Sequence, residues 1–415
     1  MSVQTQISRI TAAVGAAYDA VTAKGGTTPQ AETVAGLADA IGTIPTGGSS
    51  APGAPGDITF YDYDGTIVTS WTLEELATKT ALPDYPSHEG LTCQGWNWSL
   101  ADLKTTNRKM NVGATYITND GKTRIYIHLE DGRMSPMLGV CPNGTVTVDW
   151  GDGTTPDTLT GTSTTTVKWT PNHAYAAPGE YVIKLTVDGA IGLYGNSANN
   201  ENSGLLRYSS NADRRNHVYQ NTIKKVELGA GVIQFNQAAF ADCHALTSIT
   251  VPNSITGLPL VLFYNCYSLT SFTIPLSVKN TGTNVFGFCH SLVSVAIPNS
   301  VTAIGTSMFS NCQSLQFVTI PNSATAIYSS SFDKCYSITS LRIPSTVNRI
   351  GNMVFYNCWG IAFYDFTSHT SVPTLGTNTF YYISSDCQIR VPSSLVDDWK
   401  AATNWSDYAD QIVGV

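Results

Sequence analysis

Cysteine is the residue type in this chain with the clearest capacity for chemistry, because thiolates bind metals and paired thiols form disulfides. Nine cysteines occur in 415 residues. None belongs to a C-x-x-C pair, and no histidine lies at zinc-finger spacing from any of them. Six cysteines recur with one spacing, so the Cα–Cβ bonds of cysteines in stacked repeats would be parallel. Disulfide geometry disfavours this arrangement, because the two Cβ atoms must converge. We predict no metal, and free thiols that pack as small apolar groups. The six are Cys243, Cys266, Cys289, Cys312, Cys335 and Cys358.

Two aspartates that follow an apolar strand could transfer phosphoryl groups. The run Asp62-Tyr63-Asp64-Gly65-Thr66 fits D-x-D-G-T and resembles the nucleophile motif of haloacid-dehalogenase-type phosphatases. That resemblance implies Asp62 as nucleophile and Asp64 as general acid and base, with a magnesium ion between them. The sequence that follows does not resemble the doubly wound fold of those enzymes. We favour a hairpin turn at Asp64-Gly65.

Other candidate catalytic groups are few and dispersed. Asp149 and Asp152 could hold calcium, but we favour a structural turn because calcium usually takes more oxygen ligands than two carboxylates supply. The seven histidines are scattered, and no G-x-S-x-G, H-E-x-x-H or phosphate-binding loop occurs. The sequence therefore predicts a protein that is not an enzyme, with no catalytic residue, resident metal or cofactor.

The cysteine spacing belongs to a longer repeat of 23 residues. Each copy has phenylalanine three residues before the cysteine and an aliphatic residue three after it, followed by a short apolar alternation. One copy cannot form a core, but copies stacked about 4.8 Å apart would bring each phenylalanine onto the next. A period of this length indicates a solenoid. The phenylalanines are Phe240, Phe263, Phe286, Phe309, Phe332 and Phe355, and the prolines that close five copies are Pro252, Pro275, Pro298, Pro321 and Pro344.

Residues 223–390 resemble the BspA-type leucine-rich repeats of bacterial surface proteins, through six copies in register of F-x-x-C-x-x-L-x-x-h-x-h-P, where h is apolar and the last copy lacks the proline. The resemblance implies a C-terminal leucine-rich-repeat solenoid. Residues 391–415 carry Leu395, Trp399, Trp405 and Tyr408 at helical spacing, which predicts a helical cap over its open end. The alternate strand positions are expected to face outward, and they are Thr250, Thr273, Ala296, Thr319 and Arg342.

The position directly after the repeated cysteine is the candidate ligand-binding surface. In register, it would form an aromatic and polar stripe about 25 Å long. Such a stripe can bind a glycan or a protein receptor, or it can be a solvated ladder of turns. The outward strand face is the rival surface. The stripe residues are His244, Tyr267, His290, Gln313, Tyr336 and Trp359.

Residues 1–45 predict a helical hairpin with one apolar face per helix. They lack the continuous apolar core of a signal peptide. We favour an anchor or oligomerisation segment, and the alternative is that the two helices only pack on each other. Residues 46–56 form a linker rich in Gly, Ser and Pro. Together they resemble the N-termini of structural proteins from tailed bacteriophages and prophages. The apolar anchor residues are Ile7, Ile10, Val14, Val21, Val34, Leu37 and Ile41.

Two β units and a connector are predicted between the linker and the repeats. Residues 57–106 predict a small β module, in which Trp96 and Trp98 belong to the core or stack on sugar. Residues 107–190 resemble the polycystic-kidney-disease type of immunoglobulin-like β-sandwich, through the turn around Trp150 and the strand entry from His173 to Tyr181. Such domains serve as spacers, and residues 191–222 are expected to connect this one to the solenoid.

Composition excludes several classes of partner. Only 13% of the chain is charged, the net charge is −8, and no basic run occurs, so nucleic acid is not an expected partner. No apolar stretch approaches the ~20 residues of a membrane span, so membrane insertion is not expected either.

The expected protein is multidomain and mainly β, with a helical anchor, a small β module, a β-sandwich and a terminal solenoid. Taken together, the resemblances imply a non-enzymatic virion structural protein of a tailed phage, a tail fibre or receptor-binding protein. It would be made in the bacterial host cytoplasm and exposed on the virion, with its N-terminal helices bound to other virion proteins. The solenoid would bind a host glycan or protein, and the chain would form a homo-oligomer, with a trimer as one option. The alternatives are a phage head fibre or capsid decoration protein, and a bacterial cell-surface adhesin.

Overall fold

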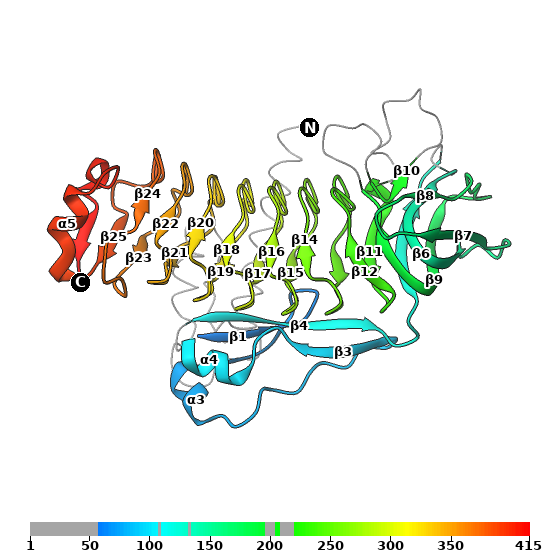
Figure 1. Ribbon diagram of the computed structural model, residues 1–415, viewed down its shortest axis with the longest axis horizontal. Helices are drawn as coiled ribbons and strands as arrows, with labels where there is room; N and C mark the ends of the chain where they lie inside the picture. The colour runs from blue at the N-terminus through cyan, green and yellow to red at the C-terminus, as the bar shows by residue number, and fades with distance from the viewer. Residues whose placement is uncertain (1–56, 107–108, 132–133, 196–203, 208–219) are drawn as a thin grey trace, which may run out of the picture. The chain divides into compact units, whose positions relative to one another are not determined.

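The computed structural model describes residues 57–106, 109–131, 134–195, 204–207 and 220–415, so the predicted anchor and linker lie outside the described residues. Residues 55–415 form one compact unit. Its strands belong to a solenoid, a small module and a sheet that leads into the solenoid (Figure 1).

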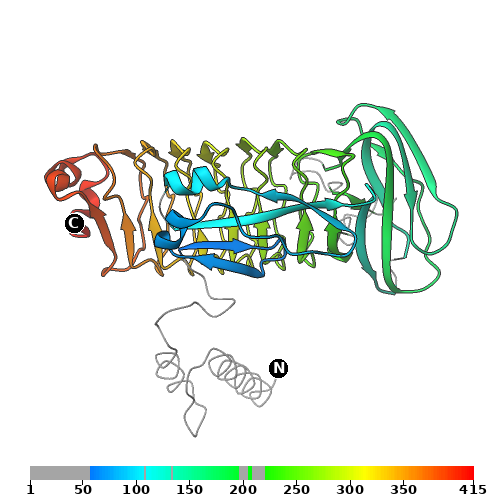
Figure 2. The same ribbon diagram turned by 90° about the horizontal axis from the view of Figure 1, so that it is seen from below.

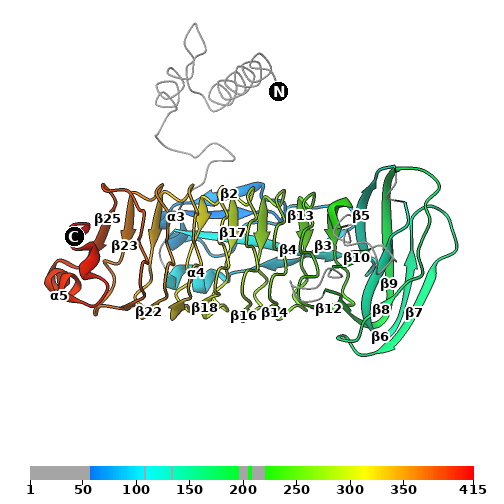
Figure 3. The same cartoon turned by 90° about the horizontal axis from the view of Figure 1, so that it is seen from above.

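Each turn of the solenoid contributes one strand to each of two rows of parallel strands (Figures 1 and 3). Ser271 pairs with Ser294, and Ser294 pairs with Phe317, so neighbouring turns are 23 residues apart as predicted. The last turns differ, because Phe363 pairs with Gln388 after an insertion of two residues. The first row is β11 (Ile223–Glu227), β13 (Ser248–Thr250), β15 (Ser271–Thr273), β17 (Ser294–Ala296), β19 (Phe317–Val318), β21 (Ser340–Arg342), β23 (Phe363–Asp365), β25 (Gln388–Val391) and β26 (Ile412–Gly414). The second row is β12 (Val232–Phe235), β14 (Gly257–Leu258), β16 (Asn280–Thr281), β18 (Ala303–Ile304), β20 (Ala326–Ile327), β22 (Arg349–Ile350) and β24 (Thr374–Leu375).

A column of stacked phenylalanines forms the centre of the solenoid core. Neighbouring rings lie 5.3–5.7 Å apart between centroids, with nearly parallel planes. The six predicted phenylalanines are all fully buried, and Phe380 continues the column beyond them. The prediction that stacking builds one continuous core is confirmed.

The repeated cysteines form a second column, and every thiol after the first is hydrogen-bonded to the turn before it. Five thiols donate to the carbonyl oxygen of the phenylalanine in the preceding turn, at 2.9–3.2 Å between sulfur and oxygen. Burial raises the pKa of Cys358 to about 12 and holds the pKa of Cys289 and Cys312 well above the usual thiol value. All nine cysteines are free, as predicted.

These thiols are therefore expected to be unreactive in the native protein. Reaction with a thiol-specific chromogenic disulfide at neutral pH should modify at most Cys93, the one half-buried cysteine, because the other eight are buried. After denaturation all nine should react. Rapid modification of several thiols in the folded protein would contradict this structure of the core.

The end of the solenoid is covered by short helical segments, as predicted. These are η3 (Ser393–Leu395), α5 (Val396–Ala401) and η4 (Ser406–Tyr408). Trp399 and Trp405 are buried against Phe366 at ring-centroid distances of 5.0 and 5.4 Å. The cap is not wholly helical, because β26 pairs in parallel with β25 and extends the first row.

His369 is buried near this cap, and its lowered pKa predicts that the solenoid loses stability in acid. Its ring nitrogens lie 3.2 Å from the carbonyl oxygens of Phe366 and Val347, and burial lowers its pKa. Below about pH 6.5 the unfolded chain binds a proton that the folded chain resists, so stability is lost as pH falls toward the folded pKa. Between about pH 7 and about pH 5, the melting temperature of His369→Gln should therefore fall less than that of the wild type. Exposed His128→Gln is the control, and equal falls for wild type and His369→Gln would contradict the prediction.

The small module is a four-stranded sheet in the order β2-β1-β4-β3. Its strands are β1 (Ile58–Tyr61), β2 (Ile67–Trp71), β3 (Leu91–Trp96) and β4 (Met110–Thr118), and its helices are α3 (Leu73–Thr78) and α4 (Leu100–Thr106). Trp96 and Trp98 are buried, as expected for core residues. The central strand β4 lies beyond the predicted boundary at residue 106, so the module continues to Thr118.

The D-x-D-G-T segment forms the turn between β1 and β2. The amide of Asp62 donates to the carbonyl oxygen of Thr66, and Asp64 accepts from the amide of Thr66, which confirms the predicted hairpin. Asp62 is 4% exposed and its carboxylate lies 2.7 Å from Nε2 of His88. In this structure Asp62 therefore links the turn to His88, and Asp64 accepts a hydrogen bond within the turn.

The module covers the strand face that the sequence predicts to be outward (Figure 2). Asn97 donates to the carbonyl oxygens of Ile274 and Ala296, both at 3.1 Å, and Trp98 donates to Ile297 at 3.0 Å. The outward side chains of Thr250 and Ala296 are 1% and 4% exposed. The prediction of a rival binding surface there is wrong over β13 to β19, because a second sheet lies on it. Arg342 remains exposed.

The region predicted as a separate sandwich is joined to the solenoid by its sheet. β5 (Thr123–Leu129) pairs with β11, the first solenoid strand, and with β9 (Gly179–Leu193). Strand β9 crosses the predicted boundary at residue 190 and ends at Leu193, inside the predicted connector. The immunoglobulin-like sandwich is thus not confirmed. The other strands of this sheet are β6 (Met137–Asp149), β7 (Asp157–Thr162), β8 (Lys168–Trp169) and β10 (Leu206–Arg207).

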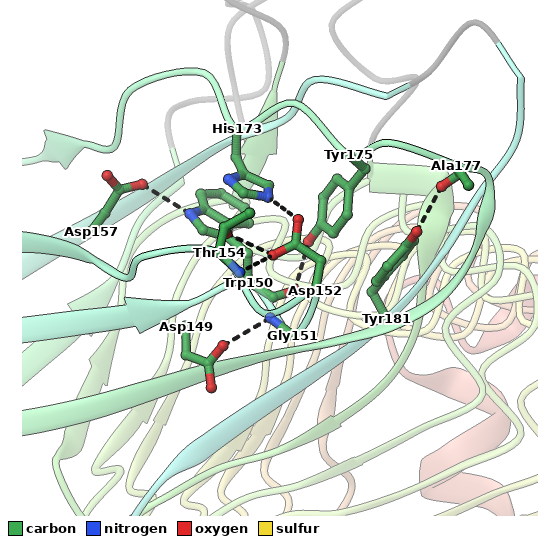
Figure 4. Close-up of polar contacts among 10 residues, drawn as sticks. All are labelled: Asp149, Trp150, Gly151, Asp152, Thr154, Asp157, His173, Tyr175, Ala177 and Tyr181. Carbon is green, nitrogen blue, oxygen red and sulfur yellow. Dashed lines mark hydrogen bonds and ion pairs between the residues drawn. The ribbon is translucent and has the colours of Figure 1, made fainter.

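The turn around Trp150 is a closed hydrogen-bonded unit (Figure 4). Asp152 accepts from the amide and hydroxyl of Thr154 and lies 2.7 Å from Nε2 of His173, whose ring stacks on Trp150. Burial alone would raise the pKa of Asp152, but these hydrogen bonds outweigh it and hold the pKa below its usual value. Asp149 accepts instead from the amide of Gly151. The carboxylates of Asp149 and Asp152 thus accept hydrogen bonds within the turn. Among the described residues no group of three metal-ligating side chains occurs.

Candidate ligand-binding surface

The stripe lies on a sharp bend that every turn of the solenoid makes at the same place. The residue before each repeated cysteine has a left-handed backbone, for example φ 62° at Asn265, 60° at Asn311 and 59° at Asn357. Asparagine and aspartate tolerate this conformation better than other non-glycine residues, and they occupy four of the six positions. The bend reverses the chain around the buried cysteine. The residue that follows the cysteine is then placed on one edge of the solenoid, which we call the turn edge.

The structure brings most of the predicted stripe residues together as stacked rings. His244 stacks on Tyr267 at 4.4 Å between centroids, and Tyr267 stacks on His290 at 4.9 Å. Tyr336 stacks on Trp359 at 5.4 Å. Five of the six residues therefore form two aromatic stacks, and the sixth, exposed Gln313, lies between them in the repeat order.

Three further aromatic residues belong to the turn edge and do not appear in the predicted stripe. Tyr356 stacks on Tyr381 at 5.8 Å, and Tyr382 meets Tyr381 edge-on at 4.4 Å. These three residues and the pair Tyr336 and Trp359 lie in the last turns of the solenoid, and we refer to the five together as the C-terminal aromatic patch. Sequence reasoning missed them because the predicted stripe considered only the position after the cysteine, whereas Tyr356 lies two residues before Cys358. The two-residue insertion also moves Tyr381 and Tyr382 out of the 23-residue register. Alignment to Phe355-Tyr356 at a spacing of 25 residues would have found them.

The C-terminal aromatic patch is the most exposed aromatic surface of the described chain. Trp359, Tyr381 and Tyr382 are 58%, 47% and 60% exposed, and Tyr267 in the first stack is 36% exposed. The neighbouring phenols of Tyr381 and Tyr356 raise the pKa of Tyr382, so its ring stays neutral at physiological pH.

The turn edge presents aromatic rings and polar groups side by side. Stacked rings offer apolar faces and edges, and the phenol and indole groups add hydrogen bonds at the rim. Such surfaces bind sugar rings or apolar side chains. The predicted anchor residues lie outside the described residues, so the structure gives them no place relative to this edge.

Comparisons with known proteins agree with the repeat architecture. The model of the BspA type leucine-rich repeat region matches six copies, over residues 214–339 and 309–398. These residues therefore form BspA-type leucine-rich repeats. No curated protein matches the chain.

Several solved structures resemble part of the chain. A leucine-rich repeat protein of T. pallidum is 29% identical over 34% of this chain and 66% of its own, with a TM-score of 0.32. A leucine-rich cell surface protein of Faecalibacterium prausnitzii is 27% identical over 45% of this chain and 53% of its own, with a TM-score of 0.36. A leucine-rich repeat protein of Bacteroides ovatus is 19% identical, covering 50% of this chain and 70% of its own, with a TM-score of 0.31. The match spans just under two thirds of the first relative and about half of the second.

Helices long and apolar enough to cross a membrane are absent from the part of the chain that the structure describes.

Proposed function

We propose that this chain, with its BspA-type leucine-rich repeats, is a non-enzymatic adhesion protein that binds a cell-surface glycan along the turn edge of its solenoid. The observation that carries this proposal is the C-terminal aromatic patch, where Trp359, Tyr381 and Tyr382 are all about half exposed on one edge of a rigid array. Burying exposed rings against a ligand releases the water that covers them, which favours binding.

A glycan fits this surface better than a protein groove would. The rings of Tyr336 and Trp359 are nearly parallel, at 28°, and lie on successive turns, so they present a shallow ridge rather than a pocket. Stacked rings cover each other's inner faces, so successive sugar units of an extended chain would contact the ring edges and the outermost face of the stack. Each immobilised ring is already held by its neighbour, so little side-chain entropy is lost on binding.

The adhesive role does not depend on where the protein is displayed. A bacterial cell-surface adhesin requires only the repeat array, which the family match supports over residues 214–398. The virion role, as a fibre or decoration protein, and the homo-oligomer depend on residues 1–45, and they stay predictions. Among the two settings we favour the bacterial cell surface.

The proposal is tested by binding of the labelled full chain to a panel of Gram-positive bacteria, Gram-negative bacteria and cultured epithelial cells. Periodate oxidation of the cells destroys vicinal diols of sugars, and protease treatment removes surface proteins. We expect saturable binding to at least one cell type that periodate abolishes and protease leaves intact. Protease-sensitive, periodate-resistant binding would replace the glycan with a protein receptor, and absence of saturable binding to every cell type would overturn the adhesive function.

A further inference from the structure

A groove lies where the small module stops covering the solenoid. Its cavity measures about 550 Å³, and it lies between the start of β1 and β4 on one side and strands β19, β21 and β23 on the other. We call it the module groove. Its polar lining includes Asp57, Asn111 and Lys109 from the module and Thr319, Arg342 and Asp365 from the solenoid.

The module groove is a consequence of how the two sheets meet. Asn111 donates to the carbonyl oxygen of Phe317 at 2.8 Å, and this bond fixes the module against β19. The next solenoid strands, β21 and β23, extend past the module, so Ser340 and Arg342 line the open side. The two walls are therefore rigid elements held at a fixed separation, which is what a preformed binding site needs.

Each wall of the groove carries one loose ion pair. Lys109 Nζ lies 3.7 Å from Asp57 Oδ1 on the module, and Arg342 Nε lies 3.6 Å from Asp365 Oδ2 on the solenoid. Both separations exceed the usual length of a charge-assisted hydrogen bond, about 2.7–2.9 Å. Both cations are also exposed, at 80% for Lys109 and 46% for Arg342. The four groups retain capacity for hydrogen bonds to a ligand.

A buried hydroxyl points to the same kind of ligand. Thr319 lines the groove and is partly exposed, but its Oγ1 is buried and has no hydrogen-bond partner among the described residues, so the side chain must rotate for the hydroxyl to reach a ligand. A buried polar group without a partner is unfavourable, and a polar ligand or water can satisfy it. The apolar part of the lining, which includes Phe317 and Phe363, offers contact area to the less polar side of a ligand.

We propose that the module groove binds a neutral saccharide of one to three sugar units. The two negative charges of Asp57 and Asp365 balance the two positive charges of Lys109 and Arg342, so the groove favours neither an anionic nor a cationic ligand. Sugar hydroxyls both donate and accept, so one ligand can donate to Asp57 and Asp365 and accept from Lys109 and Arg342. An acidic sugar that paired its carboxylate with Lys109 or Arg342 would also bring that carboxylate close to Asp57 or Asp365, which lie 3.7 and 3.6 Å from these cations. The volume lies within the usual range for small-ligand sites, about 300–1,000 Å³.

This inference goes beyond the turn-edge function, because the groove uses none of the stripe residues.

The test is titration calorimetry of the full chain with maltotriose, cellotriose, chitotriose, lactose and the acidic trigalacturonate. We expect at least one neutral sugar to bind with a Kd below about 10 mM and Arg342→Gln to weaken it at least about tenfold. Arg349→Gln, the same change in the second row of strands, is the matched control and should leave Kd unchanged.

Two outcomes would overturn the proposal. One is that no neutral sugar binds in this range, or that trigalacturonate binds more tightly than all of them. The other is that Arg342→Gln and Asp57→Asn both leave the Kd of the best neutral sugar unchanged. Trp359→Ala should leave the Kd of that sugar unchanged, because Trp359 does not line the groove. A failure of the groove proposal can therefore be distinguished from a failure of the turn-edge proposal.

Discussion

Phe286→Ala is expected to lower the free energy of unfolding by about 3–5 kcal/mol. Phe286 is fully buried at the middle of the phenylalanine column, with Phe263 and Phe309 stacked on its two faces at 5.5 and 5.6 Å. Truncation to alanine removes the contacts of the Phe286 ring with both neighbouring rings and leaves a cavity in the core. Neighbouring turns cannot close this cavity without breaking strand pairing. Equilibrium denaturation in guanidinium chloride measures the change.

The control for this prediction is Tyr382→Ala, which removes an aromatic ring of similar size from a 60% exposed position. We expect it to change the free energy of unfolding by less than about 0.5 kcal/mol. If the two variants destabilise the protein equally, the stacked column is not the main source of stability in the solenoid.

Gly113→Ala is expected to destabilise the contact between the module and the solenoid by about 2–3 kcal/mol. A Cβ atom at Gly113 would lie 2.1 Å from Oγ1 of Thr273, far inside the normal contact distance. Thr273 is β-branched and stiff, so the two sheets must separate to admit the methyl group. The module has its own core, so it should remain folded while its attachment weakens. Limited proteolysis and thermal unfolding measure the two effects.

A compensating variant makes this prediction specific. Thr273→Ala removes the two atoms nearest to the added methyl group and should restore part of the stability of Gly113→Ala. Gly257→Ala is the matched control, because its Cβ would meet only the carbonyl oxygen of Asn280 at an ordinary 3.7 Å. No rescue in the double variant would mean that the sheets are not in contact at Gly113.

The repeat array could be predicted from the sequence because its signal is redundant. Phe, Cys and an aliphatic residue recur together, so six copies fix both the period and the buried positions. Placement of His244, Tyr267 and His290 on one edge follows from that period alone. The stacking of Tyr336 on Trp359 follows in the same way.

The covering of the outward strand face could not be predicted from the repeat. Small polar residues such as Ser271, Thr273 and Ser294 are typical of a solvated strand face, yet Ser271 and Ser294 are each 5% exposed beneath the module. The contact depends on close approach of two sheets, which Gly113 permits, and on long-range hydrogen bonds such as that from Asn97 to Ala296. Residues 199 apart in sequence carry no local pattern that reveals such a contact.

The boundaries of the predicted sandwich, residues 107–190, also depend on strand pairing between residues distant in sequence. The motif around Trp150 correctly indicated a structural turn, but the same motif says nothing about where the sheet ends. Strand β5 finds its second partner in β11, the first strand of the solenoid, through pairs such as Ile125 with Val226. This pairing turns an expected spacer into the element that closes the N-terminal end of the solenoid core.

The central claim is that the turn edge binds a glycan through its exposed rings, and one comparison tests it most directly. The affinity of the full chain for the best-binding cell type should be measured for wild type, for Trp359→Ala and for Tyr328→Ala. Tyr328 is the matched control, because it is 41% exposed and follows β20 in the other row of strands. Trp359→Ala should weaken binding at least about tenfold, which corresponds to about 1.4 kcal/mol, and Tyr328→Ala should have no effect. Equal affinities for wild type and Trp359→Ala would contradict the account.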